Sequence, residues 1–378
     1  MIGGKRIVIK VGSSTLTGRD GAFLDRSRLD RVVDLIAELK REGNEVVLVS
    51  SGAIASGLAP LKLDSRPRDV TLQQAVASVG QGLLIRHYFD SFARHQVIPS
   101  QVLITAEDVI RRSHYLNVRA TLLTSLDLGL VPVINENDSV AFAEIRFGDN
   151  DRISALVSHI VGADLLLILT DVDALYDAPP KNSGSRRIAR VDDFTLLDAL
   201  DITGSDSKVG SGGMITKIDA ARIATRAGIP TFLTDLDHAT HALDSLDTTD
   251  TTDRREGGDV GTYFAPDPHV EKSTRRLWLA HASAVRGKLY LDDGAVTAIR
   301  ERGSSLLPAG VERVEGDFFR GDAVELIAPS GDVIARGLIG YDAVEVPRLL
   351  GKSTKELSET LGEEYGHELV HRDEMVLL

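Results

Sequence analysis

The chain has 378 residues, of which 43% are hydrophobic, and a formal net charge of −13 at pH 7. This length is enough for two or three packed domains, so we expect a soluble globular protein. The absence of cysteine excludes disulfides, thiol nucleophiles and cysteine-based metal centres, and the acidic charge argues against a nucleic-acid footprint over the whole protein.

Short apolar segments alternate with helix-like segments through the first two-thirds of the chain. The apolar segments are RIVIKVG, EVVLVSSG, VIPSQVLIT, LVPVINEND, ADLLLILTD and IPTFLT. They are apolar on both faces, which is typical of parallel strands covered by helices. The order strand–helix–strand therefore predicts an α/β fold, a three-layer αβα sandwich with a mainly parallel sheet.

Two of the intervening helices are amphipathic. One presents an apolar stripe from Leu29 to Leu39, and the other runs from a cap at Ser113 through Leu116, Ala120 and Leu123 to Gly129. No run of eighteen apolar residues is present, and the N-terminal segment MIGGKRIVIKVGSS is typical of a strand rather than of a secretion signal. We therefore expect a cytoplasmic protein that does not enter the membrane.

The character of the sequence changes near residue 244, where Asp, Thr, Gly and Pro become frequent and periodicity is lost. Beyond this stretch, short β-like runs alternate with turn signals such as Asp293–Gly294 and Ser330–Gly331, which predicts a small β-barrel. We divide the chain into an α/β domain at residues 1–265, a linker at 266–274, the barrel at 275–355 and a C-terminal tail at 356–378.

Polar residues follow the predicted strands at the points where these end. Lys10 interrupts the first strand, and Ser50 closes the second. Acids and amides follow three other segments or open a helix; they are Asn135 to Asp138, Asp149 to Asp151, and Thr170 with Asp171. Taken singly, each is an ordinary strand-end turn or a helix cap, but open α/β sheets bind ligands at the carboxyl ends of their strands. Together they predict a site at this edge.

The stretch VGSGGMITK, residues 209–217, places three glycines and a lysine at the start of a predicted helix. It is not a P-loop, because Lys217 follows a threonine instead of a glycine. Glycines allow backbone amides to approach an anion, so the stretch is either a phosphate site or an ordinary turn. The tail segment HELVH, residues 367–371, formally matches a zinc-protease pattern, but only seven residues follow it, and we expect no metal site there.

Taken together, IVIKVGSS, VSSGAIASG, INENDSVAFAEIRFGDND, LTDVDALY and GSGGMITK resemble the amino acid kinase family, over residues 1 to about 265, and specifically its branch that phosphorylates glutamate. The later segments GAVTAIRERGSSLLPAGV, GDFFRGD and IARGLIGYDA resemble the PUA domain. The resemblance implies an amino acid kinase fold and ATP-dependent phosphorylation of the γ-carboxylate of L-glutamate to L-glutamyl 5-phosphate. This is the first step of proline biosynthesis from glutamate, and ATP and Mg²⁺ are the implied cofactors.

The resemblance also implies roles for individual residues. Lys10 and Lys217 match the family's two phosphate-binding lysines, and Asp151 matches the acid that orients both. Ser50, Asp138 and Asn150 match its glutamate-binding positions; Asp138 suits the α-ammonium group, and Ser50 and Asn150 can donate to carboxylate oxygens. The implied ATP-binding positions are Lys10, Thr170, Asp171, Ser211, Gly212, Gly213, Met214, Ile215, Thr216 and Lys217. No protein ligand of Mg²⁺ is implied.

The family further suggests a homo-oligomer, a dimer or tetramer, with proline as a feedback inhibitor and functional coupling to glutamyl phosphate reductase. Two alternatives remain open. The protein could be a related kinase acting on aspartate, acetylglutamate or carbamate, or a regulatory protein whose PUA domain binds RNA. The nearly neutral charge of residues 275–355 disfavours strong RNA binding.

Overall fold

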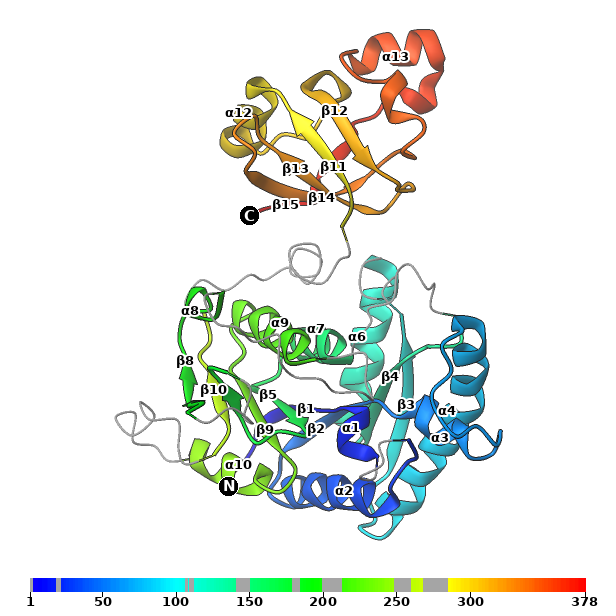
Figure 1. The fold of residues 1–378 in the computed structure, drawn as a ribbon, viewed down its shortest axis with the longest axis vertical. Helices are drawn as coiled ribbons and strands as arrows, with labels where there is room; N and C mark the ends of the chain where they lie inside the picture. The colour runs from blue at the N-terminus through cyan, green and yellow to red at the C-terminus, as the bar shows by residue number, and fades with distance from the viewer. Residues whose placement is uncertain are drawn as a thin grey trace. The chain divides into compact units, whose positions relative to one another are not determined.

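The computed structural model describes residues 3–17, 22–105, 108, 112–140, 150–178, 184–198, 213–247, 260–267 and 285–378. The chain divides into two compact units, Met1–Thr274 and Arg275–Leu378 (Figure 1). No helix within these described ranges is long and apolar enough to cross a membrane.

An eight-stranded sheet forms the centre of the first unit, in the order β3-β4-β2-β1-β5-β9-β10-β8. Its strands are β1 (Arg6–Val11), β2 (Glu45–Ser50), β3 (Pro99–Ile104), β4 (Val131–Glu136), β5 (Leu165–Thr170), β8 (Arg190–Val191), β9 (Thr231–Asp235) and β10 (Thr262–Phe264). All pairs from β3 to β9 are parallel, and β10 is antiparallel to β9. The six apolar segments all form strands, which confirms the mainly parallel sheet.

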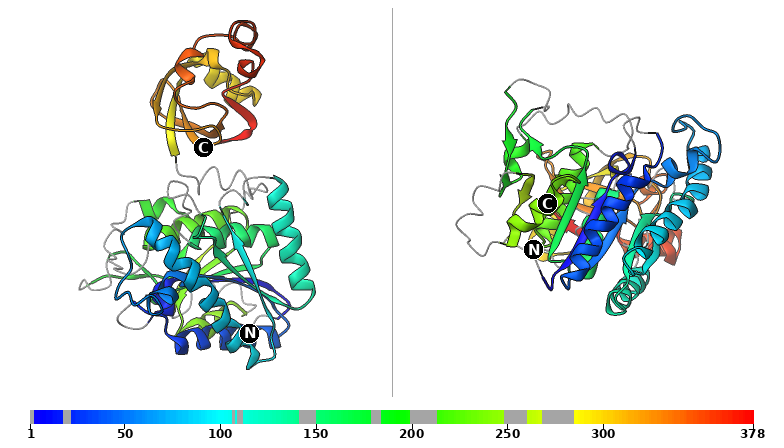
Figure 2. Two further views of the ribbon diagram at one scale, coloured as in Figure 1. Left: turned by 90° about the vertical axis from the view of Figure 1, so that its right-hand side faces the viewer. Right: turned by 90° about the horizontal axis from the view of Figure 1, so that it is seen from below.

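Helices cover both faces of this sheet (Figures 1 and 2). One face carries α2 (Arg26–Arg41), α4 (Val70–Ala93) and α10 (Ala239–Asp247), and the other carries α6 (Arg112–Asp127), α7 (Asn150–Val161) and α9 (Met214–Arg226). Shorter elements in the loops are α1 (Ser13–Leu16), α3 (Ala53–Leu58), α8 (Thr195–Asp198), and a hairpin of β6 (Leu175–Tyr176) with β7 (Arg187–Ile188). The three-layer αβα arrangement is confirmed.

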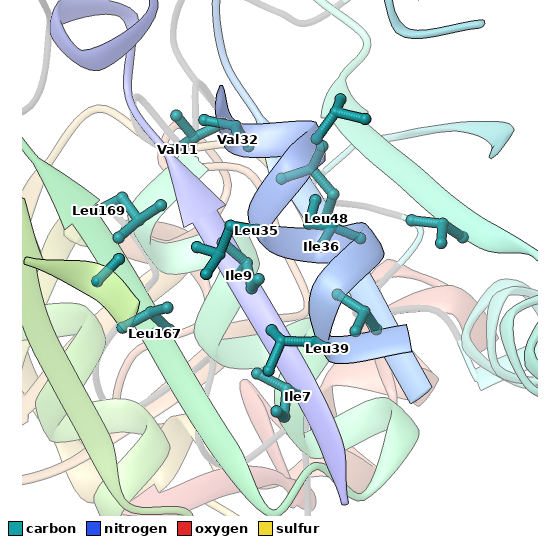
Figure 3. Packing of buried hydrophobic residues seen from close by; sticks show 14 of the residues in the cluster. Ile7, Ile9, Val11, Val32, Leu35, Ile36, Leu39, Leu48, Leu167 and Leu169 are labelled. Atoms are coloured by element: carbon teal, nitrogen blue, oxygen red, sulfur yellow. The ribbon is translucent and has the colours of Figure 1, made fainter. Parts of the chain in front are cut away.

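The core between α2 and the sheet fixes the direction of every side chain on β1. Ile7, Ile9 and Val11 point into a cluster with Ile36 and Leu39 of α2 (Figure 3). Because side chains alternate along a strand, Lys10 must point to the opposite face, toward α7 and α9.

The helix α6 buries a different face from the predicted one. Leu116 is 51% exposed, whereas Leu122 and Leu126 are buried. The helix contacts β4 and α7 through this second stripe, and Gly129, with φ of 75°, follows its end. The predicted stripe is therefore wrong, because the apolar residues of this helix are spread over more than one face and do not reveal which stripe meets the sheet.

A separate five-stranded sheet, in the order β12-β11-β13-β14-β15, forms the second unit. Its elements are β11 (Val285–Leu291), α12 (Asp293–Arg302), a 3₁₀ turn η4 (Pro308–Gly310), β12 (Val311–Gly316), β13 (Ala323–Ile327), β14 (Val333–Ile339), η5 (Val346–Arg348), α13 (Thr354–Leu361), η6 (Glu363–Tyr365) and β15 (Val370–Leu377). The strand-rich character agrees with the sequence analysis.

The C-terminal segment is part of this second unit, which differs from the predicted separate tail. The strand β15 pairs with β14, and Leu357, Val370 and Met375 belong to the unit's core. The charged run His371 to Glu374 conceals this strand in the sequence, because an edge strand exposes much of its surface to solvent.

Candidate functional site

The predicted site residue Lys10 lies near the carboxyl end of the central strand β1. Its neighbours in the sheet are Val49 of β2 and Ile168 of β5. The Lys10 side chain is almost completely buried, at 3% exposure, on the α7 side of the sheet. An ammonium group is costly to bury without an anion. The anion that Lys10 contacts therefore indicates what the lysine does.

That partner is Asp151, in the first turn of α7, with a fully buried side chain. Asp151 Oδ1 forms an ion pair with Lys10 Nζ, and Oδ2 lies 3.3 Å from Lys217 Nζ. The hydroxyl of Thr216 also donates to Oδ2, at 2.9 Å. Two lysines thus share one carboxylate, and the three groups together carry a net positive charge. Such a buried centre is suited to bind an anion.

Local sequence explains how each lysine reaches this point. A Cβ atom on Gly12 would lie 3.3 Å from Lys10 Nζ, so the glycine leaves room for the amine. Lys217 lies in the first turn of α9, and Gly213 occupies the N-cap without a side-chain hydrogen bond to the helix. An uncapped helix N-terminus offers backbone amides and a positive dipole end to an anion.

A second polar cluster joins the ends of β2 and β4 to the start of α7. Asn150 Nδ2 donates to Ser51 Oγ and to Asn135 Oδ1, both at 2.9 Å. Asn135 Nδ2 in turn donates to Gln81 Oε1 of α4, at 2.8 Å. The backbone amide of Glu136 donates to Asn135 Oδ1 and, at 3.3 Å, to Asn150 Oδ1. The side chain of the predicted residue Asn150 is therefore held by the ends of two strands, β2 and β4.

The side chain of Ser50, a predicted glutamate ligand, faces away from the Asn150 side chain. It is paired with Val11, so its side chain points to the α4 side of the sheet, and it is fully buried. Its hydroxyl donates to the Ser51 carbonyl at 2.8 Å and lies 2.8 Å from the hydroxyl of Tyr88. Burial raises the pKa of Tyr88, so this phenol stays neutral. The hydroxyl on the Asn150 side belongs to Ser51, because adjacent serines at a strand end face opposite sides.

Three further predicted ligands of glutamate and ATP, Asp138, Thr170 and Asp171, lie along the same edge. Asp138 is half-buried in the turn after β4. Thr170 is buried at the end of β5, on the same sheet face as Lys10, and its hydroxyl donates to exposed Asp171 at 3.0 Å. These positions are compatible with a ligand that extends along the carboxyl ends of β4, β1 and β5.

The glycine-rich stretch is described only from Gly213 onward; Ser211 and Gly212 lie outside the described residues. Met214 packs against a small cluster that includes Phe264, while Ile215 is 52% exposed. Ile215 is the large apolar side chain at the helix entrance that remains available to a ligand.

The helix α4 supplies two residues, Gln81 and Tyr88, that the sequence alone does not place near the site. The helix is set close to α3 by two glycines: a Cβ on Gly80 would lie 1.8 Å from the Ala53 carbonyl, and one on Gly57 would lie 2.2 Å from the Val76 carbonyl. A glycine inside a helical pattern indicates such close packing, and VGQG was the available signal.

The zinc-like segment at 367–371 is not a helix. Its last residues begin strand β15, with Leu369 and Val370 buried, so its two histidines do not lie one helical turn apart. Within the described ranges, no group of three or more histidine and acidic side chains could hold a metal ion.

Comparison with known proteins places these features in a family. The amino acid kinase family matches residues 5–235, and the PUA domain matches residues 287–361. The chain is 54% identical over 376 residues to the glutamate 5-kinase of Streptomyces coelicolor, covering 99% of this chain and 96% of that protein. It is 50% identical over 375 residues to the glutamate 5-kinase of Thermobifida fusca, covering 99% and 93%.

The fold of the first unit also has a counterpart among solved structures. Carbamate kinase from Giardia lamblia bound to AMP-PNP aligns with a TM-score of 0.51 at 18% identity, covering 70% of this chain and 99% of that one. At this identity the likeness shows a shared fold alone.

Proposed function

The chain belongs to the amino acid kinase family and, within it, to the glutamate 5-kinases, and from this premise we propose how its buried charges serve the reaction. That reaction is ATP-dependent phosphorylation of the γ-carboxylate of L-glutamate to L-glutamyl 5-phosphate, in proline biosynthesis. A carboxylate is already a nucleophile, so no general base is needed. The barrier comes from bringing two anions together and from the charge on the transferring phosphoryl group.

Lys10 and Lys217 are the proposed catalytic residues, because they supply positive charge at the centre of the sheet edge. The observation that supports this role is their shared ion pair with the buried carboxylate of Asp151. Asp151 is a positioning residue: it holds both amines without touching the substrate. A clamp fixed in advance stabilises transition-state charge without reorganisation during the reaction.

For glutamate, we assign Asp138 to the α-ammonium group, since a carboxylate is the natural partner of an ammonium ion. Asn150 borders the same site, and Ser51 takes the place that the sequence analysis gave to Ser50. The support for this exchange is the contact between Ser51 Oγ and Asn150 Nδ2, together with the complete burial of Ser50.

For ATP, the proposed ligands are Thr170, Asp171 and the run from Ser211 to Lys217. The uncapped N-terminus of α9 and the two buried lysines fit the phosphates, which supports this placement. Mg²⁺, when bound to the ATP phosphates, neutralises part of their charge. We name no protein ligand for it.

We also propose that the protein is a homo-oligomer, a dimer or tetramer. β3 is an edge strand of the large sheet, and large apolar side chains are exposed on β3 and on nearby helices and loops. They are Phe89, Ile98, Leu103, Leu116 and Leu128. Exposed apolar groups of this kind are typical of interfaces. Light scattering that gives the mass of a monomer at micromolar concentration would refute the oligomer.

The second unit contains a cavity of about 610 Å³, and the charge of its lining does not favour RNA binding. Its acidic lining residues Asp342, Glu345, Glu368 and Glu374 outnumber its one arginine, Arg320. Phosphate groups are repelled by such a surface. Feedback inhibition by proline and coupling to glutamyl phosphate reductase stay predictions from the family.

The experiment that tests the function is a hydroxamate assay. Protein, ATP, Mg²⁺ and hydroxylamine are combined with glutamate, and with aspartate or acetylglutamate as controls. We expect γ-glutamyl hydroxamate from glutamate, with little product from the controls. Product from a control substrate at a higher rate would assign the chain to a sibling kinase.

A further inference from the structure

A chain of side-chain amides crosses the carboxyl edge of the large sheet, from α4 on one face to α7 on the other. It starts at Gln81 Oε1, which accepts from Asn135 Nδ2 at 2.8 Å. Asn135 Oδ1 accepts from Asn150 Nδ2 at 2.9 Å, and the same Asn150 nitrogen donates to Ser51 Oγ at 2.9 Å. We call Gln81, Asn135, Asn150 and Ser51 the amide relay.

The donors and acceptors of the relay fix its direction. Asn135 must present its nitrogen to Gln81, because its oxygen already accepts from the backbone amide of Glu136 at 2.9 Å. The Asn135 oxygen therefore also faces Asn150, which must present its own nitrogen. An amide nitrogen has two hydrogens, and the two short bonds of the Asn150 nitrogen go to Asn135 and Ser51, whereas the Ser50 carbonyl lies farther away, at 3.4 Å.

Two consequences for a ligand follow from this direction. Ser51 Oγ accepts from Asn150, and within the described part of the chain no residue accepts the Ser51 hydroxyl hydrogen in turn. Ser51 therefore faces a ligand as a donor, which suits a carboxylate oxygen. Asn150 keeps acceptor capacity on Oδ1, which suits an ammonium group and differs from the donor role that the sequence analysis gave it.

We propose that Gln81 is a positioning residue for glutamate, acting through Asn135 and Asn150 to orient the Ser51 hydroxyl toward a carboxylate of the substrate. Burial makes the device effective: Asn135 is only 2% exposed, so water does not readily replace Gln81 as its partner. The proposal rests on the proposed function, since it names the group that this site presents to glutamate.

The test is a double-mutant cycle on the full chain, with Gln81→Ala, Ser51→Ala and the combined variant. Alanine suits the helix at residue 81 and cannot overpack the site. We expect Gln81→Ala to raise the glutamate KM about tenfold, the cost of one poorly oriented hydrogen bond, with kcat and the ATP KM nearly unchanged. In the Ser51→Ala background the same substitution should have little further effect, because the group it orients is gone.

The matched control is Gln73→Ala on the same helix, which loses bonds to the Pro67 carbonyl and to Arg66, neither of which belongs to the relay. It should keep the wild-type glutamate KM. If Gln81→Ala does not fold, Gln81→Met, which retains the side-chain length, takes its place in the cycle.

The outcomes separate the inference from the function. The relay would be overturned if Gln81→Ala leaves the glutamate KM unchanged. It would also be overturned if Gln81→Ala raises this KM by the same factor in the wild-type and Ser51→Ala backgrounds. In both cases the enzyme would stay a glutamate kinase. A wild-type protein that forms no γ-glutamyl hydroxamate would instead overturn the proposed function.

Discussion

Lys10 and Lys217 form ion pairs with the two different oxygens of one buried carboxylate, that of Asp151. One lysine comes from the first strand of the sheet and the other from a helix near the end of the first unit. The two lysines that we propose bind phosphate are thus brought together at the N-terminus of α7.

Replacement of either lysine should reduce catalysis. Lys10→Ala and Lys217→Ala each remove a cation from the clamp, and we expect kcat to fall by about 10²-fold or more, by analogy with the loss of a transition-state donor. Steady-state kinetics with glutamate and ATP measures this. Lys288→Ala, an exposed lysine of the second unit, is the control. Turnover close to the wild-type value in either clamp variant would contradict the assignment.

Asp151→Asn should reduce both activity and stability. The substitution keeps the shape of the side chain but leaves two buried ammonium groups without their shared anion. Removing one partner of a buried pair costs about 3–5 kcal/mol, so urea unfolding should show a lower free energy of unfolding together with a lower kcat. A variant as stable and as active as the wild type would show that other groups hold the lysines.

The sheet could be predicted because each buried strand is a continuous apolar run, a pattern that survives in the sequence. Lys10, Asp151 and Lys217 could be named through the family resemblance, but their contact depends on the register of β1 against α7, which no local pattern shows. Ser50 and Ser51 illustrate the limit. Which of the two side chains faces Asn150 depends on where β2 ends, because a shift of one residue along a strand moves a side chain to the other face of the sheet. Gln81 is a polar residue in a helix, and the sequence alone therefore suggests that it lies on the surface.

Asp138→Ala should raise the glutamate KM steeply and leave the ATP KM unchanged. The carboxylate is the proposed partner of the α-ammonium group, and a charge-assisted hydrogen bond is worth about 1.5–3 kcal/mol, or about 10- to 150-fold in KM. Separate titrations of each substrate at saturating levels of the other provide the measurement. A change confined to the ATP KM would place Asp138 on the nucleotide instead.

Tyr88→Phe should destabilise the protein modestly. The Tyr88 hydroxyl is buried and bonds to Ser50, so its removal costs about 1 kcal/mol in the free energy of unfolding. The glutamate KM should change much less than in Ser51→Ala, because Ser50 faces away from Asn150. A glutamate KM raised as far as in Ser51→Ala would return Ser50 to the substrate site.

Two glycines on one helix provide a matched test of how α4 positions Gln81. On Gly80 a Cβ would lie 1.8 Å from the Ala53 carbonyl and 2.5 Å from the Gly57 amide, both backbone atoms that cannot rotate away. Gly80→Ala must therefore push α4 away from α3. We expect a loss of about 1–3 kcal/mol or more in the free energy of unfolding, and a higher glutamate KM because Gln81 moves as well.

The matched control is Gly82 on the same helix. On Gly82 a Cβ would meet nothing within 4 Å, so Gly82→Ala should stabilise the helix by up to about 1 kcal/mol. Urea unfolding of both variants measures the difference in their free energies of unfolding. If Gly80→Ala is as stable as Gly82→Ala, the close packing of α3 on α4 does not set the position of the relay.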